Sequence, residues 1–438
     1  MIQRIRAKAR LPRVYSAIFV IAYFLASFVN YLFGVGLSWF LTPDQFGVLG
    51  VAQSLLLMGG LVVGSGFAWT STRILASQGT NDQSRAGIRT SLLANIILGI
   101  VLGFGLWIFY LNGWIPLGPI YSTVTPLIAL TMTILSARAV LNGAGRGIYR
   151  FSWVAVNLVL EVLIKAGVGL WFVISGAGVN GVMAAFAIGA FFSLLHSIWI
   201  IKPIHLWQGK SWIDRSVFTS TVPIFLAMLG PALMVNLDIL GLKLLSPPQS
   251  ADRLAGYYQA AAILARAPVF IAQAFTHVLF SRAAGSQKDL PGNTNSNGNQ
   301  YLQTALRLWL WILLPASLGM ILLPKVILSI LFPDAYLIAA PTLQIASVGG
   351  ALLALVTLFS GVLQALGETR YSVFAAISAT IAQVFTLVWA IPYWGAAGAA
   401  WSLIVAGAIA LLLFIPALKG VGFRPRLLPI RIEHYLDN

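Results

Sequence analysis

The stretch SWFLTPDQFGVLGVAQSLLLMGGLVVGSGFAWTSTRILA, residues 38–76, decides the fold class of this chain. Beyond the polar group at 42–45, residues 48–72 contain no charged side chain, and Arg73 follows them. A helix of about 20 apolar residues is long enough to cross the hydrocarbon core of a bilayer. The stretch therefore predicts a transmembrane helix over 48–72 that ends at a basic residue.

Eleven other segments have the same length and apolarity, which predicts twelve transmembrane helices in an all-α integral membrane protein. Only 9% of the residues are charged, whereas a soluble domain has about a quarter. The absence of cysteine excludes disulfides and thiolate metal sites, and the four histidines are too scattered to predict a metal or cofactor site. The other predicted spans are 15–41, 88–110, 118–142, 152–175, 179–201, 217–245, 254–280, 302–323, 338–366, 371–393 and 396–418.

The distribution of lysine and arginine predicts that both termini lie in the cytoplasm. With the N-terminus inside, only three of the 27 basic residues fall in outer loops, namely Lys243, Arg253 and Lys325. Two more lie inside spans, and the remaining 22 flank the cytoplasmic ends, as the positive-inside rule requires. We therefore expect a multi-pass protein of the cell membrane whose net charge of +16 faces lipid headgroups rather than nucleic acid.

A weak internal repeat divides the predicted spans into two halves. Gly47 precedes Arg73 by 26 residues, and Gly256 precedes Arg282 by the same distance, so that each pair brackets one span. The offset between the pairs, 209 residues, is close to half of the chain. Two further matches occur in the same order, LNGAGRGIY at 141–149 with LQALGETRY at 363–371, and the glycines that open the sixth and twelfth spans.

This repeat predicts two six-helix lobes, residues 1–201 and 217–438, joined by a cytoplasmic linker at 202–216. Because each lobe has an even number of spans, the repeats have parallel orientation and are related by an axis along the membrane normal. Two lobes around a central cavity are the architecture of an alternating-access transporter.

Charged side chains inside the predicted spans are the candidates for function, because inserting each costs ~2.5–3.5 kcal/mol near a helix centre. Glu161 and Lys165 are four residues apart in the fifth span, so they share one helix face. Asp238 lies toward the outer end of the seventh span, and Arg266 lies near the middle of the eighth. The residues leave two interpretations open for each couple, a structural ion pair inside one lobe or a pair that lines the cavity.

The order of motifs along the chain is similar to that of the oligosaccharide flippases of the multidrug/oligosaccharidyl-lipid/polysaccharide exporter superfamily. The resemblance covers nearly the whole chain, although no single motif is highly specific. Its first part is a turn and span formed by Leu41, Thr42, Pro43, Asp44, Phe46, Gly47 and Arg73. The other parts are AGYYQAAAILARAPVF at 255–270, LSILFPDAYLIAAPTLQI at 328–345 and WGAAGAAWSLI at 394–404.

Such a resemblance implies two six-helix bundles around a V-shaped cavity. It also implies that the protein moves a polyprenyl-pyrophosphate-linked oligosaccharide from the inner to the outer leaflet. The cargo would serve cell-surface polysaccharide biosynthesis, for example lipopolysaccharide O-antigen, capsule or exopolysaccharide. The sequence does not choose among these pathways.

If that function holds, basic residues bind the pyrophosphate. Arg266 and Lys165, one from each predicted lobe, are deep enough to bind it near the membrane midplane, and a guanidinium matches phosphate oxygens bidentately. Arg73 and Arg282, at equivalent cytoplasmic span ends, would gather it at the cavity mouth, or would serve only as positive-inside anchors. Arg138, near the cytoplasmic end of the fourth span, is expected to snorkel toward the headgroups.

The acidic residues would be charge partners or ion-coupling groups. Glu161 would exchange a proton while Lys165 alternates between Glu161 and the substrate phosphate. Asp238 would pair with Arg266 if neighbouring helices bring the two together. Energy would come from a proton or sodium gradient, from the membrane potential, or from consumption of the product outside, because no G-x-x-x-x-G-K-[ST] motif is present.

Two other functions remain as alternatives. An ion-coupled multidrug or cation antiporter of the same superfamily would need acidic cavity residues, typically in the first span, which has none. A membrane-embedded glycosyl-transfer enzyme would carry acids or arginines in sizeable outer loops, whereas these loops are short and no Asp-x-Asp pair occurs. The polar segment 281–301 is a candidate contact for polysaccharide assembly enzymes, although nothing in it identifies them.

Overall fold

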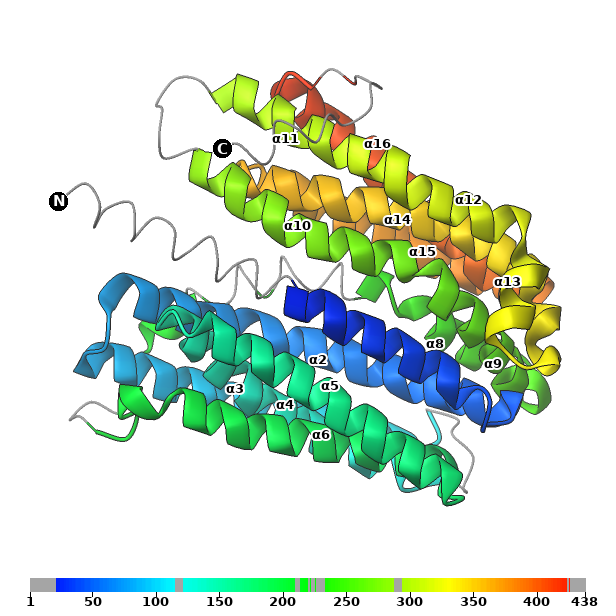
Figure 1. The fold of residues 1–438 in the computed structure, drawn as a ribbon, viewed down its shortest axis with the longest axis horizontal. Helices are drawn as coiled ribbons and strands as arrows, with labels where there is room; N and C mark the ends of the chain where they lie inside the picture. The colour runs from blue at the N-terminus through cyan, green and yellow to red at the C-terminus, as the bar shows by residue number, and fades with distance from the viewer. Residues whose placement is uncertain are drawn as a thin grey trace. The chain divides into compact units, whose positions relative to one another are not determined.

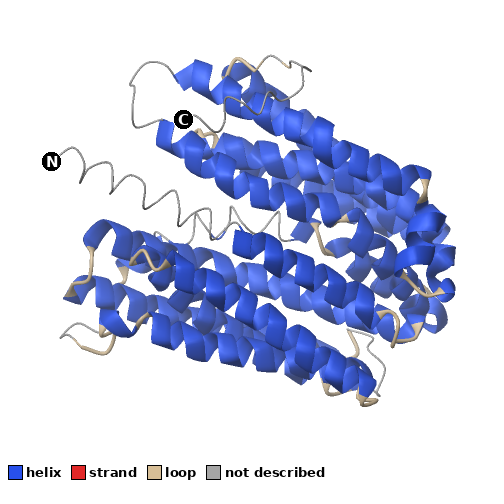
Figure 2. Ribbon diagram, in the orientation of Figure 1, coloured by secondary structure: helices blue, strands red, loops and turns tan. Residues whose placement is uncertain are grey.

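The computed structural model describes residues 21–114, 121–208, 213–219, 221, 225, 233–286, 294–423 and 425. All regular elements in these ranges are helices (Figure 2). The chain forms two compact units, Met1–Gln259 and Ala260–Asn438, and within each unit the helices run side by side (Figure 1). The basic segment 1–13, residues 220, 222–224 and 226–232 of the predicted span 217–245, and the middle of the segment 281–301 lie outside the described residues.

The first unit contains the helices that correspond to the first six predicted spans. Its elements are the helix Ile21–Leu37, α2 (Pro43–Gln78), α3 (Asp82–Leu111), α4 (Val124–Gly147), α5 (Phe151–Ile174), α6 (Gly178–Ile200), the 3-10 turn η2 (Lys202–Ile204), α8 (Leu237–Leu245) and most of α9 (Pro248–Ala265).

The second unit contains the remaining helices, including one that the sequence does not predict, α13. Its elements are α10 (Ala267–Ser286), α11 (Thr294–Leu308), the π-helix η3 (Trp309–Leu313), α12 (Leu314–Leu322), α13 (Pro324–Leu331), the 3-10 turn η4 (Asp334–Ala339), α14 (Ala340–Ala365), α15 (Thr369–Trp394) and α16 (Ala396–Gly420).

The predicted number of spans agrees with these helices. Within the described part of the chain, nine helices are long and apolar enough to cross a membrane, and the bent pair α9–α10 makes a tenth. Ile21–Leu37 is a shorter apolar helix, and α8 forms the end of the predicted span 217–245. The protein is therefore an all-α, multi-pass membrane protein.

The α2 helix begins at the polar group that the sequence analysis interpreted as a turn. Thr42 is the N-cap, and its side chain accepts a hydrogen bond from the backbone N–H of Gln45 while the Gln45 side chain accepts one from the Thr42 N–H. Pro43 occupies the first helical turn, where a missing N–H costs nothing. The sequence Thr-Pro-Asp-Gln thus forms a capping box that fixes where the span starts.

Two glycines allow α2 and α9 to cross with their backbones in contact. A Cβ added to Gly47 would lie 1.9 Å from the Asp252 carbonyl oxygen, and one added to Gly256 would lie 1.8 Å from the Pro43 carbonyl oxygen. The contact is reciprocal, because residues 43 and 47 become 252 and 256 when the repeat offset of 209 is added. Only glycine fits at either position.

Small and polar side chains hold α2, α3 and α4 together. The amide of Asn95, fully buried on α3, donates to the carbonyl oxygens of Val63 on α2 and Ser136 on α4, at 2.8 and 2.7 Å. A Cβ on Gly143 would lie 2.2 Å from the Ala68 carbonyl oxygen, so α4 approaches α2 closely. Small residues and interhelical hydrogen bonds are the usual means of helix association in a membrane, where burial of apolar surface gives no advantage over lipid.

The predicted linker packs against the start of α3. The Arg85 side chain donates to the Ile204 carbonyl oxygen at 2.9 Å, and the Thr90 hydroxyl accepts from the Asp214 N–H at 2.8 Å. The described residues of 202–216 are therefore fastened to the first unit. The division into lobes at this segment stays a prediction.

Arg266 lies at a break between α9 and α10. The two helices meet at an angle of 41°, and Arg266 itself is outside both. Pro268, two residues later, cannot donate a backbone hydrogen bond to the preceding turn, so the helix bends there. The bend falls at the arginine proposed for substrate binding.

Candidate functional site

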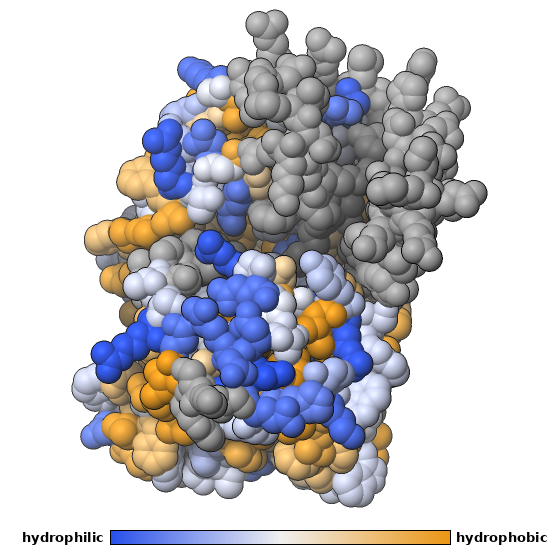
Figure 3. Space-filling model, turned by 90° about the vertical axis from the view of Figure 1, so that its left-hand side faces the viewer, coloured by the Kyte–Doolittle hydropathy of each residue, from blue (hydrophilic) through white to orange (hydrophobic). Residues whose placement is uncertain are grey.

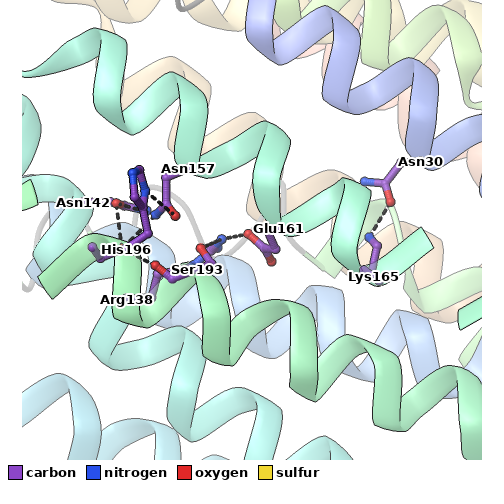
Figure 4. Close-up of polar contacts among 9 residues, drawn as sticks. Asn30, Arg138, Asn142, Asn157, Glu161, Lys165, Ser193 and His196 are labelled. Atoms are coloured by element: carbon purple, nitrogen blue, oxygen red, sulfur yellow. Dashed lines mark hydrogen bonds and ion pairs between the residues drawn. The ribbon is translucent and has the colours of Figure 1, made fainter. Parts of the chain in front are cut away.

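Lys165 lies inside the first unit, on α5, with 8% of its surface exposed. Its ammonium group donates to the side-chain oxygen of Asn30, which is on the helix Ile21–Leu37 (Figure 4). The same group lies 4.5 Å from the ring centroid of Phe186 on α6, a cation–π contact. The lysine therefore has a neutral hydrogen-bond partner and an aromatic face.

Glu161 forms an ion pair with Arg138 on α4 rather than with Lys165, so the predicted pairing on α5 is wrong. Both side chains are largely buried, with 20% of Arg138 and 17% of Glu161 exposed. Arg138 also approaches the Ser193 hydroxyl on α6, at 3.4 Å (Figure 4). The expectation that Arg138 snorkels to the headgroups is therefore wrong as well, since its guanidinium points into the bundle toward a carboxylate.

The pairing differs from the prediction for a geometric reason. Residues four apart on one helix share a face, but they must bend toward each other to touch. Arg138 approaches from a neighbouring helix, and its planar guanidinium matches the two carboxylate oxygens better than an ammonium does. Lys165 instead extends its flexible stem to Asn30.

A second polar cluster joins the same three helices beside the ion pair. The Asn157 amide on α5 donates to Asn142 on α4 at 2.9 Å and to the Ser197 hydroxyl on α6 at 2.8 Å. A ring nitrogen of His196 lies 3.1 Å from the Asn157 side-chain oxygen (Figure 4). Asn157 and Ser197 are fully buried, so this cluster is a structural joint between α4, α5 and α6.

Arg146, which the sequence did not single out, is a further cation on α4 and is half-buried. Its guanidinium carbon lies 5.5 Å from the ring centroid of Trp69 on α2. The buried Nε of Arg146 has no hydrogen-bond partner, and no carboxylate pairs with this side chain in the part of the chain that the structure describes. Its position inside the repeated segment LNGAGRGIY was the signal that could have identified it.

These contacts leave an excess of positive charge on α4 and α5. The two helices carry three cations, Arg138, Arg146 and Lys165, and a single acid, Glu161. Glu161 neutralises only Arg138. Arg146 instead contacts the ring of Trp69, and Lys165 contacts the Phe186 ring and the neutral amide of Asn30. A buried charge is stabilised by pairing, so Lys165 and Arg146 are each a candidate for binding an anion.

The remaining predicted residues are more scattered. Asp238 is fully buried on α8 and accepts from the Tyr258 hydroxyl at 2.6 Å. Arg266 is buried at the α9–α10 break, with 7% exposed. Asp238 and Arg266 belong to different units, and their pairing stays a prediction.

The two arginines proposed for the cavity mouth are on long helices. Arg73 is exposed near the end of α2. Arg282 is on α10, but its side chain lies outside the described residues. Figure 3 shows hydrophilic residues gathered at the end of the first unit where α2 leads into α3, and the exposed residues there include Arg73, Gln78, Asn81, Asp82, Gln83 and Lys202.

The sequence of the chain matches one known protein family over most of its length. The sequence profile of the family described as polysaccharide biosynthesis protein matches residues 37–341, which is more than half of the chain. The chain belongs to this family. The match includes the α2 capping box, the cation-rich helices α4 and α5, and Arg266. No curated protein sequence matches the chain.

Solved structures of transporters share the fold of this polysaccharide biosynthesis protein. The lipid II flippase MurJ, in an inward closed conformation, has a TM-score of 0.74 and 15% identity over 93% of this chain and 87% of its own. A superfamily transporter from Pyrococcus furiosus has a TM-score of 0.68 and 15% identity over 94% of this chain and 96% of its own. Its binding pocket is described as having reverse polarity. An inward-facing multidrug transporter of the superfamily has a TM-score of 0.62 and 17% identity over 92% of this chain and 94% of its own. The fold is thus that of the predicted superfamily.

Proposed function

We propose that the protein is a transporter, and not an enzyme, that moves a polyprenyl-pyrophosphate-linked oligosaccharide from the inner to the outer leaflet of the cell membrane. The observation that carries the proposal is the cation excess on α4 and α5, where Lys165 and Arg146 lack an anionic partner among the described residues. A pyrophosphate group carries two negative charges or more and would supply the anionic partner that each of these cations lacks in the described part of the chain. Membership of a polysaccharide biosynthesis family supports a glycan as the cargo.

Lys165 is suited to bind and release a phosphate. Exchanging the neutral Asn30 oxygen for a phosphate oxygen gives the ammonium group an acceptor of opposite charge, which the amide does not supply. The flexible lysine stem allows this exchange without movement of α5. Arg266, at the helix break, would bind the same group, and Arg73 and Arg282 would attract it at the cytoplasmic end.

The Arg138–Glu161 pair offers a way to couple an ion to transport. Protonation of Glu161 would remove the counter-charge of Arg138 and add a third cation to the site. The proton would then raise the affinity for pyrophosphate, and loss of the proton would lower it. Asp238 stays a candidate for a second ion-coupling group, and sodium is the alternative coupling ion.

Leaflet exchange in reconstituted vesicles tests the function. The purified protein would be incorporated into vesicles with a fluorescent polyprenyl-pyrophosphate sugar, and the fraction exposed to an added quencher would be followed in time. We expect accelerated exchange that depends on the pyrophosphate. If several sugar substrates all exchange at the rate of protein-free vesicles, the proposal is wrong, and export of an organic cation by the same vesicles would favour the antiporter.

Matched variants connect the assay to the site. Arg266→Ala and Lys165→Gln should each abolish exchange in protein that inserts and folds normally. Arg253→Ala, on the exposed part of α9, and Lys419→Gln, near the end of α16, make the same changes outside the site and should exchange like the wild type. Wild-type exchange by Arg266→Ala would remove that residue from the mechanism.

A further inference from the structure

The chain between α12 and α14 contains a short helix where a loop was expected. The α12 helix ends at Leu322, and Leu323 has φ −124° and ψ 43°, outside the helical region. The chain then turns into α13 and reaches α14 through η4. The α13 helix therefore lies beyond the end of one membrane span and before the start of the next.

Six of the eight residues of α13 form three distinct faces. Pro324 and Leu328 are buried against the second unit, and Val326 and Ile330 are apolar and exposed, at 52% and 70%. Lys325 and Ser329 are polar and exposed. At about 100° per residue, the members of each pair share one face and the three faces are separated by about 100° or more.

This arrangement fits a helix at the boundary between hydrocarbon and water. One face packs on the protein, one would contact lipid, and one would contact the aqueous headgroup layer. The apolar face continues into neighbouring exposed side chains, Leu322, Leu323 and Ile338, at 72%, 55% and 67%. Exposed apolar surface of this extent, next to a membrane span, is covered by lipid.

A hollow beside the start of α13 has the composition expected for a lipid site. It has a volume of about 270 Å³ and is formed by Leu322, Leu323, Pro324, Lys325 and Val326 together with Ala340, Pro341 and Gln344 at the start of α14. Lys325 forms no ion pair with any described residue, and the exposed acid Asp334, in η4, is not its partner.

We propose that α13 holds a phospholipid with an anionic headgroup. Lys325 pairs with the lipid phosphate, while Leu322, Leu323 and Val326 contact the upper part of an acyl chain. The distribution of basic residues predicts that this lipid belongs to the outer leaflet. The lysine ammonium and the apolar side chains complement the two ends of such a lipid, and phosphatidylglycerol fits better than phosphatidylcholine because its headgroup carries no cation.

The position of α13 can be measured with single spin labels, because the protein has no cysteine of its own. Labels attached to Val326→Cys, Ser329→Cys and Ile330→Cys would be compared in phosphatidylcholine vesicles. The labels at 326 and 330 should collide mainly with oxygen, which dissolves in hydrocarbon, and the label at 329 mainly with a water-soluble nickel chelate. Equal access of the nickel chelate to all three labels would place α13 in water and overturn the proposal.

Lipid selectivity is tested with a fluorophore on Ile330→Cys and headgroup-quencher lipids. Quencher-bearing phosphatidylglycerol should quench the fluorophore more than quencher-bearing phosphatidylcholine does. A lysine near a membrane surface contributes about 1 kcal/mol to the binding of anionic lipid. Lys325→Gln should therefore reduce the affinity for phosphatidylglycerol relative to phosphatidylcholine about fivefold. Lys419→Gln, a change at another exposed lysine of this unit, should leave this affinity unchanged. Equal quenching by both lipids, or no effect of Lys325→Gln, would refute the site, whatever the cargo of the transporter.

Discussion

The close crossing of α2 and α9 predicts that Gly256→Ala destabilises the protein. The added Cβ would lie 1.8 Å from the Pro43 carbonyl oxygen and 3.2 Å from the Gly47 nitrogen. Both are backbone atoms, so no side chain can rotate out of the way. Since real Cβ atoms stay beyond 3.0 Å from such neighbours, the two helices must separate by more than an ångström.

The loss of unfolding free energy that this separation causes can be estimated from other overpacked contacts. Overpacking a tight contact costs about 1–3 kcal/mol, and a contact between two backbones belongs at the upper end of that range. Gly64→Ala is the matched control, because a Cβ at that position on α2 has nothing within 4 Å. Alanine is favoured over glycine in a helix interior by roughly 0.5–1 kcal/mol, so the control should be neutral or more stable than the wild type.

The two variants are thus expected to change stability in opposite directions. The free energy of unfolding would be measured in mixed micelles by titration with sodium dodecyl sulfate, with circular dichroism as the signal. Gly47→Ala should resemble Gly256→Ala, and the double variant should cost less than the sum, because one separation relieves both contacts. A Gly256→Ala protein as stable as Gly64→Ala would show that α2 and α9 do not cross as described.

Three other predictions concern the first unit. Asn95→Ala should lower the free energy of unfolding by about 1 kcal/mol, since the amide joins three helices, while Asn112→Ala, on an exposed amide, should have no effect in the same titration. Glu161→Leu should cost about 3 kcal/mol because it leaves Arg138 buried and unpaired, and adding Arg138→Leu should recover most of the loss in a double-mutant cycle. Lys165→Gln should retain wild-type stability, because glutamine can still bond to Asn30, while leaflet exchange is lost; a large loss of stability would make the lysine structural.

The helices were predictable because each span needs a long apolar run, and that requirement is local in sequence. The start of α2 was predictable in position, since Thr42 and Pro43 are helix-initiating residues, although the sequence suggested a turn there. By contrast, α13 was missed because its eight residues are too short to cross a membrane and continue the apolar run of α12. Their exposure, rather than their hydropathy, distinguishes them.

The candidate site was predictable in residue type but not in pairing. Buried charges are rare in a membrane, so Glu161 and Lys165 were evident from sequence alone. Which cation contacts Glu161 depends on how α4 packs against α5, and that packing is set by distant small residues rather than by the helix repeat. For the same reason the stacking of Arg146 on Trp69 had no sequence signal beyond the motif that contains it.

The reciprocal glycine contact gives the weak sequence repeat a physical meaning. An offset of 209 residues between two glycine–arginine pairs could arise by chance in a chain with 41 glycines. A chance offset, however, gives no reason for the paired positions to touch. In a two-fold arrangement, residue 256 faces residue 43 in the same way as residue 47 faces residue 252. A Cβ added to either glycine would lie almost equally close to the opposite carbonyl oxygen, at 1.9 and 1.8 Å, as that symmetry requires.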